Sequence, residues 1–150
     1  MPVLRATYAN QDGKPEPGVL AQAGPRIQVV IGCPPVPVVD PASVASLAPP
    51  DRAVWALIDT GATSGCVDEK VASELGLKVI DRQRVSGIAG LNEHNVYLIR
   101  IVVPVLNIQV NAPFTGVNLD AGTPVILGRD FLAGTIFVYD GIHGLITVCN

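Results

Sequence analysis

The sequence predicts an all-β fold with one short helix, and three observations lead to this prediction. Thirteen prolines and fifteen glycines in 150 residues indicate many short strands joined by turns rather than a helical bundle. Aromatic residues make up only 5% of the chain, so part of its 49% hydrophobic content must be aliphatic β-branched residues, which suit a packed sheet. Only 15% of the residues are charged, which argues against disorder.

The bulk composition also excludes several classes of partner. The length fits a single domain, 1–150, with a real core. The net charge is −3 and no cluster of Lys and Arg offers a phosphate-binding face, so we expect no nucleic acid. Polar residues and prolines interrupt the uncharged stretch 101–119, so we expect no membrane span.

Cysteine and histidine usage indicates neither a disulfide framework nor a metal site. The three cysteines are odd in number and have no paired spacing, and there are only two histidines. The N-terminal residues lack the pattern of a signal peptide. We therefore expect a soluble, cytoplasmic protein without metal or organic cofactor.

The first half of the chain alternates between strands and turns. Residues 3–9 and 26–31 read as strands, and residues 33–52 as a proline-rich loop insertion in which 40–47 form one short helical piece. Residues 53–58 are apolar throughout, which predicts a strand buried on both faces. Val67, Val71 and Leu75 then have helical spacing, with Asp68 as the N-cap and Gly76 as the stop.

The second half returns to strand patterns. Residues 85–92 predict a glycine-rich hairpin tip, and residues 106–111 alternate between apolar and amide side chains, as in a half-buried strand. Residues 125–128 form a short apolar strand that ends in glycine. Residues 135–139 and 145–149 predict a hairpin around the turn 140–144.

One aspartate stands out at the end of the apolar strand 53–58. An ionisable Asp59 is costly to bury there without a purpose or a partner. The following Thr60, Gly61 and Ala62 can build a tight turn that presents its carboxylate.

The order of motifs from 53 to 149 resembles the retropepsins, the single-domain branch of the pepsin superfamily. The motifs are Leu57–Thr63, a short helix, a glycine-rich hairpin, and Val125–Phe131. The resemblance implies a closed acid-protease barrel that forms a twofold homodimer, with Asp59 catalytic and Thr60 joining the two triplets across the axis. Implied supports of the active site are Thr60, Gly61, Ala62, Ile126, Leu127 and Gly128, and the implied substrate-binding flap contains Gly87, Ile88, Ala89, Gly90 and Leu91.

The chain departs from the family pattern in two places. Retroviral members usually have an acidic residue at the position of Thr63, and that acid pairs with the arginine equivalent to Arg129. Because Thr63 carries no charge, Asp130 or Glu69 are the candidate partners of Arg129 in this chain. The first fifty residues exceed the minimal family plan and are either a pro-segment or part of the fold. In the family, terminal strands of both subunits interleave, and residues 144–149 resemble such a strand.

The chemistry that the resemblance implies needs two carboxylates, one ionised and one protonated. No second Asp-Thr-Gly or Asp-Ser-Gly occurs in the 150 residues, so the second carboxylate must come from another copy of the chain. The expected function is a homodimeric aspartic endopeptidase acting on extended polypeptides. The alternatives are a catalytically weak peptide-binding or processing module with the same fold, and a structural protein whose triplet is coincidental.

Other reactive side chains have simpler interpretations. His94 lies on the proposed flap, where it is either a solvated hairpin residue or a contact to substrate, and His143 is expected to be exposed in a turn. We expect Cys66 to be a buried packing residue and Trp55 a core residue. Asp140 is expected to form a turn, and Asp130 either supports the site or pairs with Arg129.

Overall fold

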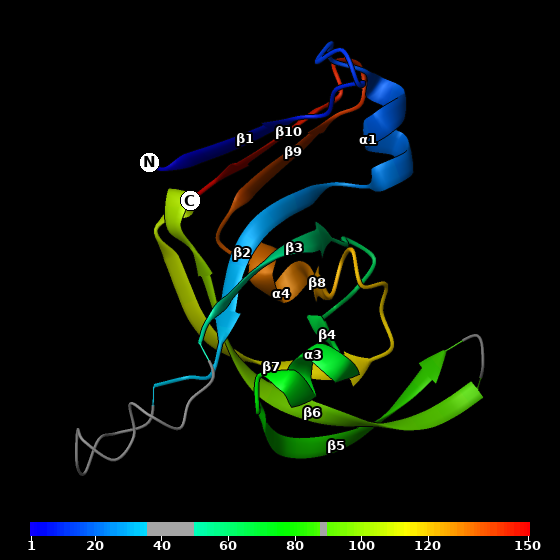
Figure 1. Ribbon diagram of the computed structural model, residues 1–150, viewed down its shortest axis with the longest axis vertical. Coiled ribbons are helices and arrows are strands. Elements are labelled where there is room, and N and C mark those ends of the chain that lie inside the picture. Colours follow the sequence, from blue (N-terminus) through cyan, green and yellow to red (C-terminus); the bar gives the residue numbers. More distant parts are fainter. Residues whose placement is uncertain (36–49, 88–89) are drawn as a thin grey trace.

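The computed structural model spans residues 1–150 and describes all of them except 36–49 and 88–89 (Figure 1). The strands are β1 (Val3–Thr7), β2 (Arg26–Gly32), β3 (Arg52–Ile58), β4 (Cys66–Asp68), β5 (Lys78–Gly87), β6 (Gly90–Val103), β7 (Ile108–Val117), β8 (Val125–Leu127), β9 (Ile136–Asp140) and β10 (Leu145–Cys149). The helices are α1 (Pro17–Ala23), α3 (Glu69–Glu74) and α4 (Arg129–Leu132), with a 3-10 turn η1 at Pro104–Leu106.

The larger sheet closes on itself. Its strand order is β2-β3-β8-β4-β7-β6-β5, and β2 also pairs with β6, so every strand except β5 belongs to a closed barrel. The barrel interior holds fully buried aliphatic side chains such as Ile31, Ile99 and Leu127. The predicted closed, all-β barrel is therefore confirmed.

A second, three-stranded sheet in the order β1-β10-β9 contains both ends of the chain and lies against the barrel (Figure 1). Ile146 and Val148 of β10 are fully buried and join the barrel core. The Tyr8 hydroxyl donates to the Arg26 carbonyl oxygen at 3.2 Å and so connects this sheet to β2. Within this single chain, β10 is flanked on both sides by strands of its own sheet, β1 and β9, and interleaving of residues 144–149 with a second subunit stays a prediction.

The strand before Asp59 is less buried than its composition predicts. Ala56 and Ile58 of β3 are buried, but Trp55 is 47% exposed. The prediction of a strand buried on both faces, with Trp55 in the core, is therefore wrong. Among the described residues, the first half of β3 pairs only with β2, because the short β8 pairs with β3 from Ala56 onward.

The predicted helix is present as α3, and the prediction of a single helix is wrong. The Asp68 carboxylate accepts hydrogen bonds from the backbone N–H groups of Lys70 and Val71, as an N-cap does. Two further helices were not predicted: α1, where Pro17 stands at the start of the helix, and α4, which is only one turn long. The predicted helical piece at 40–47 lies outside the described residues.

Two hairpins lie where the sequence predicts them. In the first hairpin, β5 pairs with β6 from the Lys78–Leu98 pair to the Gly87–Gly90 pair at the tip. The tip residues 88–89 lie outside the described part. β9 and β10 form the second hairpin. The alternating strand begins at Ile108 rather than 106, because Asn107 has a left-handed backbone (φ 54°) after η1.

The base of the proline-rich segment is closed by ion pairing between described residues. The Arg100 guanidinium donates to both carboxylate oxygens of Asp51 at 2.6 Å and to the Cys33 carbonyl oxygen at 3.2 Å. These contacts join the end of β2 and the start of β3 to β6. None of the described helices is long and apolar enough to cross a membrane.

Candidate active site

Asp59 lies in a tight turn at the end of β3. Its carboxylate oxygen Oδ1 accepts a hydrogen bond from the Gly61 N–H at 2.8 Å, and the Ala62 N–H donates to its carbonyl oxygen at 3.2 Å. The Asp59 side chain is half-buried while Thr60 and Gly61 are exposed. The turn therefore presents the carboxylate at the surface, with its Oδ1 atom held by a backbone donor.

β8 supports this turn from behind. The Asp59 N–H donates to the Leu127 carbonyl oxygen at 2.9 Å, which continues the parallel pairing of β3 with β8. A Cβ atom on Gly128 would lie 2.7 Å from the backbone carbon of Ser64, so only glycine allows this approach. The predicted support residues Thr60, Gly61, Ala62, Ile126, Leu127 and Gly128 thus lie together around Asp59.

Arg129 connects α4 to the Asp59 turn. Its partner is neither Asp130 nor Glu69, the two carboxylates predicted from the sequence. Its guanidinium donates to the carbonyl oxygens of Thr60 and Gly61, at 2.8 and 3.2 Å, and to the Thr63 hydroxyl at 2.9 Å. Thr63 itself thus accepts the hydrogen bond that an acidic residue would otherwise accept. A hydroxyl can do so because it offers two lone pairs.

The two carboxylates proposed for Arg129 have other contacts. Asp130 accepts hydrogen bonds from the Gly65 N–H at 3.3 Å and from the Phe131 N–H at 2.8 Å. Glu69 accepts from the Tyr97 hydroxyl at 2.5 Å. Asp130 therefore supports the loop that follows the Asp59 turn.

Cys66 lies close behind the turn and is half-buried. Burial raises the pKa of its thiol, and the nearby charges of Asp130 and Asp59 raise it further. A thiol with a raised pKa is mostly neutral near pH 7 and is a poor nucleophile. This agrees with its interpretation as a packing residue.

The hairpin of β5 and β6 carries the predicted flap residues. Gly87 and Gly90 pair with each other, and Leu91 is 64% exposed. Ile88 and Ala89 lie outside the described residues. Among the described residues, the hydrogen bonds of Asp59 are made to its own turn and to β8, and not to this hairpin.

Neither of two surface hollows is lined by Asp59. One, of about 530 Å³, lies between β7 and α4, and the other, of about 330 Å³, lies between β1, α1 and Trp55.

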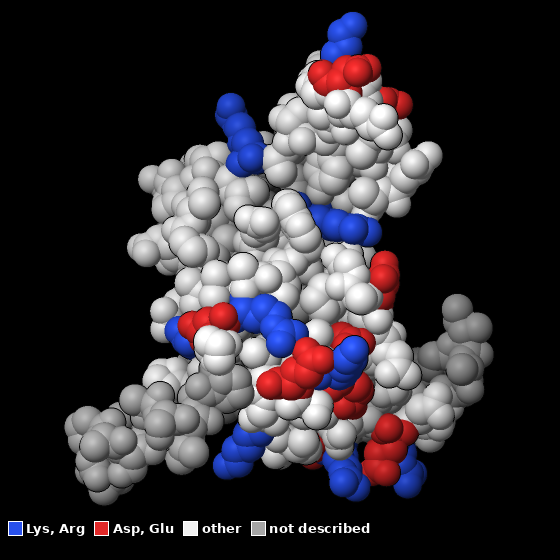
Figure 2. Space-filling view, viewed as in Figure 1, with Lys and Arg blue, Asp and Glu red and all other residues white. Residues whose placement is uncertain are grey.

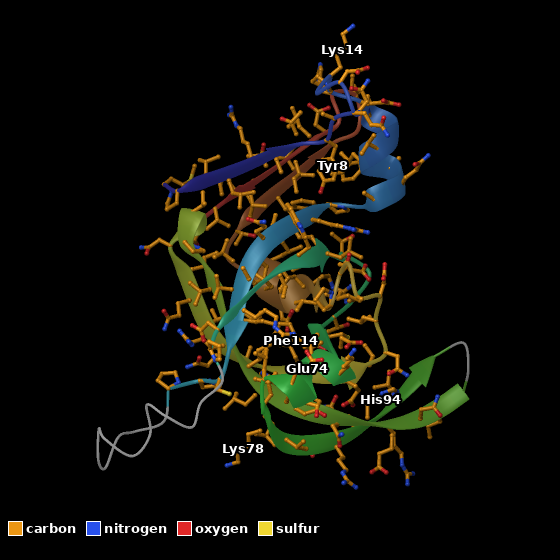
Figure 3. All side chains as sticks on the ribbon, in the orientation of Figure 1. Tyr8, Lys14, Glu74, Lys78, His94 and Phe114 are labelled. Carbon is orange, nitrogen blue, oxygen red and sulfur yellow. The ribbon has the colours of Figure 1, made fainter. Side chains whose placement is uncertain are left out.

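The remaining candidates lie away from Asp59. His94 is half-buried, not exposed as predicted, and its Nδ1 lies 2.9 Å from the Gly116 carbonyl oxygen; Figure 3 shows it on the arm of β6. His143 is exposed and contacts the carboxylate of Asp140, which forms the β9–β10 turn as predicted. No group of three His, Cys, Asp or Glu side chains within the described residues could bind a metal ion.

One supporting residue was recognised from the sequence only as a helix cap. Asp68 Oδ2 accepts a hydrogen bond from the Leu119 N–H at 2.9 Å while Oδ1 caps α3. Asp68 therefore joins the loop 118–124, which leads into β8, to the helix that follows the Asp59 turn. Leu119 is fifty-one positions away in sequence, and the pairing of β4 with β7 brings it close.

Comparisons with known proteins agree with this geometry. Residues 50–134 match the model of the family described as "gag-polyprotein putative aspartyl protease". The EIAV protease complexed with the inhibitor HBY-793 is similar in structure, with a TM-score of 0.50, 18% sequence identity, and coverage of 74% of this chain and 86% of that chain.

A retropepsin-like aspartic protease from Rickettsia conorii is also similar, with a TM-score of 0.51, 15% identity, and coverage of 97% of this chain and 91% of that chain. A comparison with curated protein sequences finds no match. At these identities, the two structural similarities establish the fold.

Proposed function

The chain belongs to the gag-polyprotein aspartyl protease family, and on that premise we propose that it is a homodimeric aspartic endopeptidase. Each subunit contributes one Asp59, and the two carboxyl groups form one site. No metal or organic cofactor takes part in this proposal.

The observation that carries the proposal is the presentation of a single Asp59 by the Asp-Thr-Gly turn. The carboxylate is half-buried, accepts the Gly61 N–H, and lies in a turn fixed by Arg129 and β8. The sequence has no second such triplet, so one chain supplies half of a dyad. A second copy related by a twofold axis supplies the other half.

In the proposed reaction, water lies between the two Asp59 carboxyl groups. The ionised carboxylate takes a proton from the water, whose oxygen attacks the peptide carbonyl carbon. The protonated carboxyl donates its proton to the carbonyl oxygen, which gives a neutral tetrahedral diol. The proton taken from water then moves to the departing nitrogen as the C–N bond breaks, and the other carboxylate recovers its proton from the diol.

The proposed substrate is an extended polypeptide segment with mostly apolar side chains beside the cleaved bond. A strand-like peptide suits the β5–β6 hairpin, the flap in this proposal, because backbone groups of an extended chain pair with strands.

A catalytically weak peptide-binding or processing module is the second candidate. The observation that favours it is Thr63, which gives Arg129 a neutral partner at the catalytic turn. A neutral partner restrains the guanidinium less strongly than a carboxylate does. Retention of the intact Asp59 turn favours the enzyme, because binding alone does not need the acid.

One experiment separates these functions. Purified protein is incubated with denatured casein at several pH values, with and without a statine-type transition-state analogue. Cleavage that the analogue inhibits supports the endopeptidase. Binding of the analogue without cleavage supports the module, and neither binding nor cleavage supports a structural protein.

A further inference from the structure

We propose that the hollow between β1, α1 and Trp55 binds the C-terminal residue of a peptide, with the free carboxylate on Arg26 and an apolar side chain against Trp55. Peptides of this kind are what the proposed endopeptidase releases, so the source of the ligand rests on the proposed function. The chemistry of the site rests only on the residues that line the hollow.

The hollow has the size and the walls of a site for a single residue. Its volume is about 330 Å³, and small aliphatic side chains line it, namely Ala6, Ala9, Val19 and Ala23. Ligand pockets range from about 300 to 1,000 Å³, so this one is at the small end of the range. It therefore suits one side chain with its carboxylate rather than a long segment.

Trp55 supplies an aromatic wall. Its side chain is 47% exposed, although the strand that carries it contributes Ala56 and Ile58 to the buried core. An aromatic side chain has a large apolar surface, and covering it with another apolar group is favourable. An apolar ligand side chain would remove this surface from water.

Arg26 supplies a positive charge that no described carboxylate neutralises. Its Nε donates to the Ala23 carbonyl oxygen at 2.8 Å, which holds the guanidinium at the end of α1. Among the described residues, its two Nη groups have no hydrogen-bond or ion-pair partner. Two Nη groups on a planar guanidinium match the two oxygens of a carboxylate.

Tyr8 positions Arg26 without competing for its charge. The Tyr8 hydroxyl donates to the Arg26 carbonyl oxygen at 3.2 Å and accepts from the Arg26 N–H, and Figure 3 shows Tyr8 between β1 and β2. Burial raises the pKa of Tyr8, so the hydroxyl is neutral near pH 7. On the face drawn in Figure 2, acidic side chains gather at the top of the molecule and over α3, β5 and β6, and the surface between them carries few.

The combination of a guanidinium and an apolar hollow identifies the class of ligand. The C-terminal residue of a peptide has an ionised carboxylate and a side chain on the same carbon atom. An internal residue has no such carboxylate, and an acidic side chain has no apolar group beyond its charge. Cleavage beside apolar side chains, as proposed, leaves an apolar residue with a new carboxylate at the end of one product.

The hollow shares a strand with the candidate active site. Arg26 is paired with Leu57 of β3, and the Ile58 N–H donates to the Pro25 carbonyl oxygen at 2.8 Å. Asp59 follows Ile58 directly. A peptide end bound in the hollow therefore contacts the strand that presents the catalytic carboxylate.

Trp55 makes the proposal directly measurable, because it is the only tryptophan in the sequence. N-acetyl-leucine titrated into the full chain should change the tryptophan fluorescence in a saturable way. N-acetyl-leucinamide has the same side chain but no carboxylate, and it should bind about tenfold more weakly or worse, since a charged hydrogen bond is lost. No saturable change, or equal affinity for the acid and the amide, would overturn the site. This comparison needs no variant.

Variants of Arg26 assign the carboxylate contact. Arg26→Gln should raise the dissociation constant of N-acetyl-leucine about tenfold and remove the preference for the acid over the amide. Arg26→Lys keeps the charge and should keep the preference. Arg5→Gln removes an arginine of β1 that does not line the hollow, and this matched control should bind like the wild type. An equal loss in Arg5→Gln and Arg26→Gln would show a nonspecific charge effect and overturn the contact.

Two further probes identify the source of the carboxylate. Acetyl-Ala-Ala-Leu should bind at least as tightly as N-acetyl-leucine, because the hollow accepts a peptide end. Octanoate has a carboxylate and an apolar chain but no peptide, and tighter binding of octanoate than of both leucine compounds would overturn the assignment to peptides.

The binding measurements are independent of the proposed function. Asp59→Asn protein should bind N-acetyl-leucine like the wild type, because Asp59 does not line the hollow. Binding by a wild type that cleaves no peptide would support this site and contradict the endopeptidase. Cleavage by a wild type that does not bind N-acetyl-leucine would contradict this site alone.

Discussion

Asp59 is the residue on which the proposed chemistry depends. Asp59→Asn should abolish cleavage while the fold is retained, because the amide cannot take a proton from water and is close to the acid in size. The Gly61 N–H can still donate to the amide oxygen, so the turn should persist. Peptide-cleavage assays and thermal unfolding check this, and retained activity in a preparation free of other proteases would contradict the assignment.

The hydrogen bond between Thr63 and Arg129 replaces the ion pair that an acidic residue would form, and its contribution to stability can be measured. Thr63→Val removes the hydroxyl that accepts from Arg129 and should lower the free energy of unfolding by about 1 kcal/mol, since one hydrogen bond to a charged donor is lost at an exposed site. Thr63→Ser keeps the hydroxyl and is the matched control. Urea denaturation measures the difference, and equal stability of the two variants would show that the contact is immaterial.

The pH dependence of cleavage distinguishes an aspartic dyad from a mechanism that uses the Cys66 thiol, whose pKa is raised. Above neutral pH an aspartic dyad loses its shared proton, so activity should fall there, and it should fall again in strong acid when both carboxyls are protonated. The Cys66 thiolate behaves oppositely, because its population grows as pH rises towards the raised pKa. A rate that keeps rising through pH 9 and is blocked by iodoacetamide would identify a thiol mechanism instead.

At the scale of elements, Asp68 performs two functions that one substitution can separate. In Asp68→Asn the amide oxygen still caps α3, but its NH₂ group cannot accept from the Leu119 N–H. We expect hydrogen exchange at Leu119 to accelerate while Lys70 and Val71 stay protected. Asp68→Ala should lose protection at all three amides and cost about 1 kcal/mol more, the usual value of an N-cap.

If the Leu119 amide is equally protected in the Asp68→Asn protein, the loop 118–124 does not depend on this contact. Peptide-cleavage kinetics of the same variants then show whether the loop matters to the proposed activity. A rise in KM at constant kcat would indicate a contribution to substrate binding.

The role of a terminal strand depends on the strands and core residues that it packs against in the structure. By sequence, residues 144–149 resemble a strand that a partner could receive. In the structure, Ile146 and Val148 are fully buried in the core of their own subunit. β10 is therefore part of the fold of one subunit, and its removal would disturb the monomer as well as any dimer.

At the scale of the whole molecule, the shared site predicts that inactive subunits inhibit active ones. A mixed dimer of wild type and Asp59→Asn holds one carboxyl and one amide and lacks either the base or the acid. After free exchange of subunits, active dimers scale with the square of the wild-type fraction. An equal mixture should therefore retain about a quarter of full activity, against about half for a self-sufficient monomer.

The mixture is first partly unfolded and refolded together so that subunits exchange, and exchange is verified by mass. Peptide cleavage is then measured against the mutant fraction at fixed total protein. A linear fall in activity would rule out a shared site.

Local patterns in the sequence were enough for β2, β3, β8, the β9–β10 hairpin, α3 and the Asp59 turn, but they did not predict β4. Those features depend on residues that are close in sequence, such as the Asp68 cap of α3 or the glycines of the hairpin tip. The conformations of such segments follow from side-chain spacing and backbone preference.

Long-range contacts decided the rest. Thr63 and Arg129 meet, and β1 pairs with β10, only because the barrel brings together segments far apart in sequence. The exposure of Trp55 likewise depends on which strands lie beside β3, and its apolar composition carries no information about that. Sequence spacing predicts which residue types can interact, whereas the free energy of packing the whole chain selects which of them do.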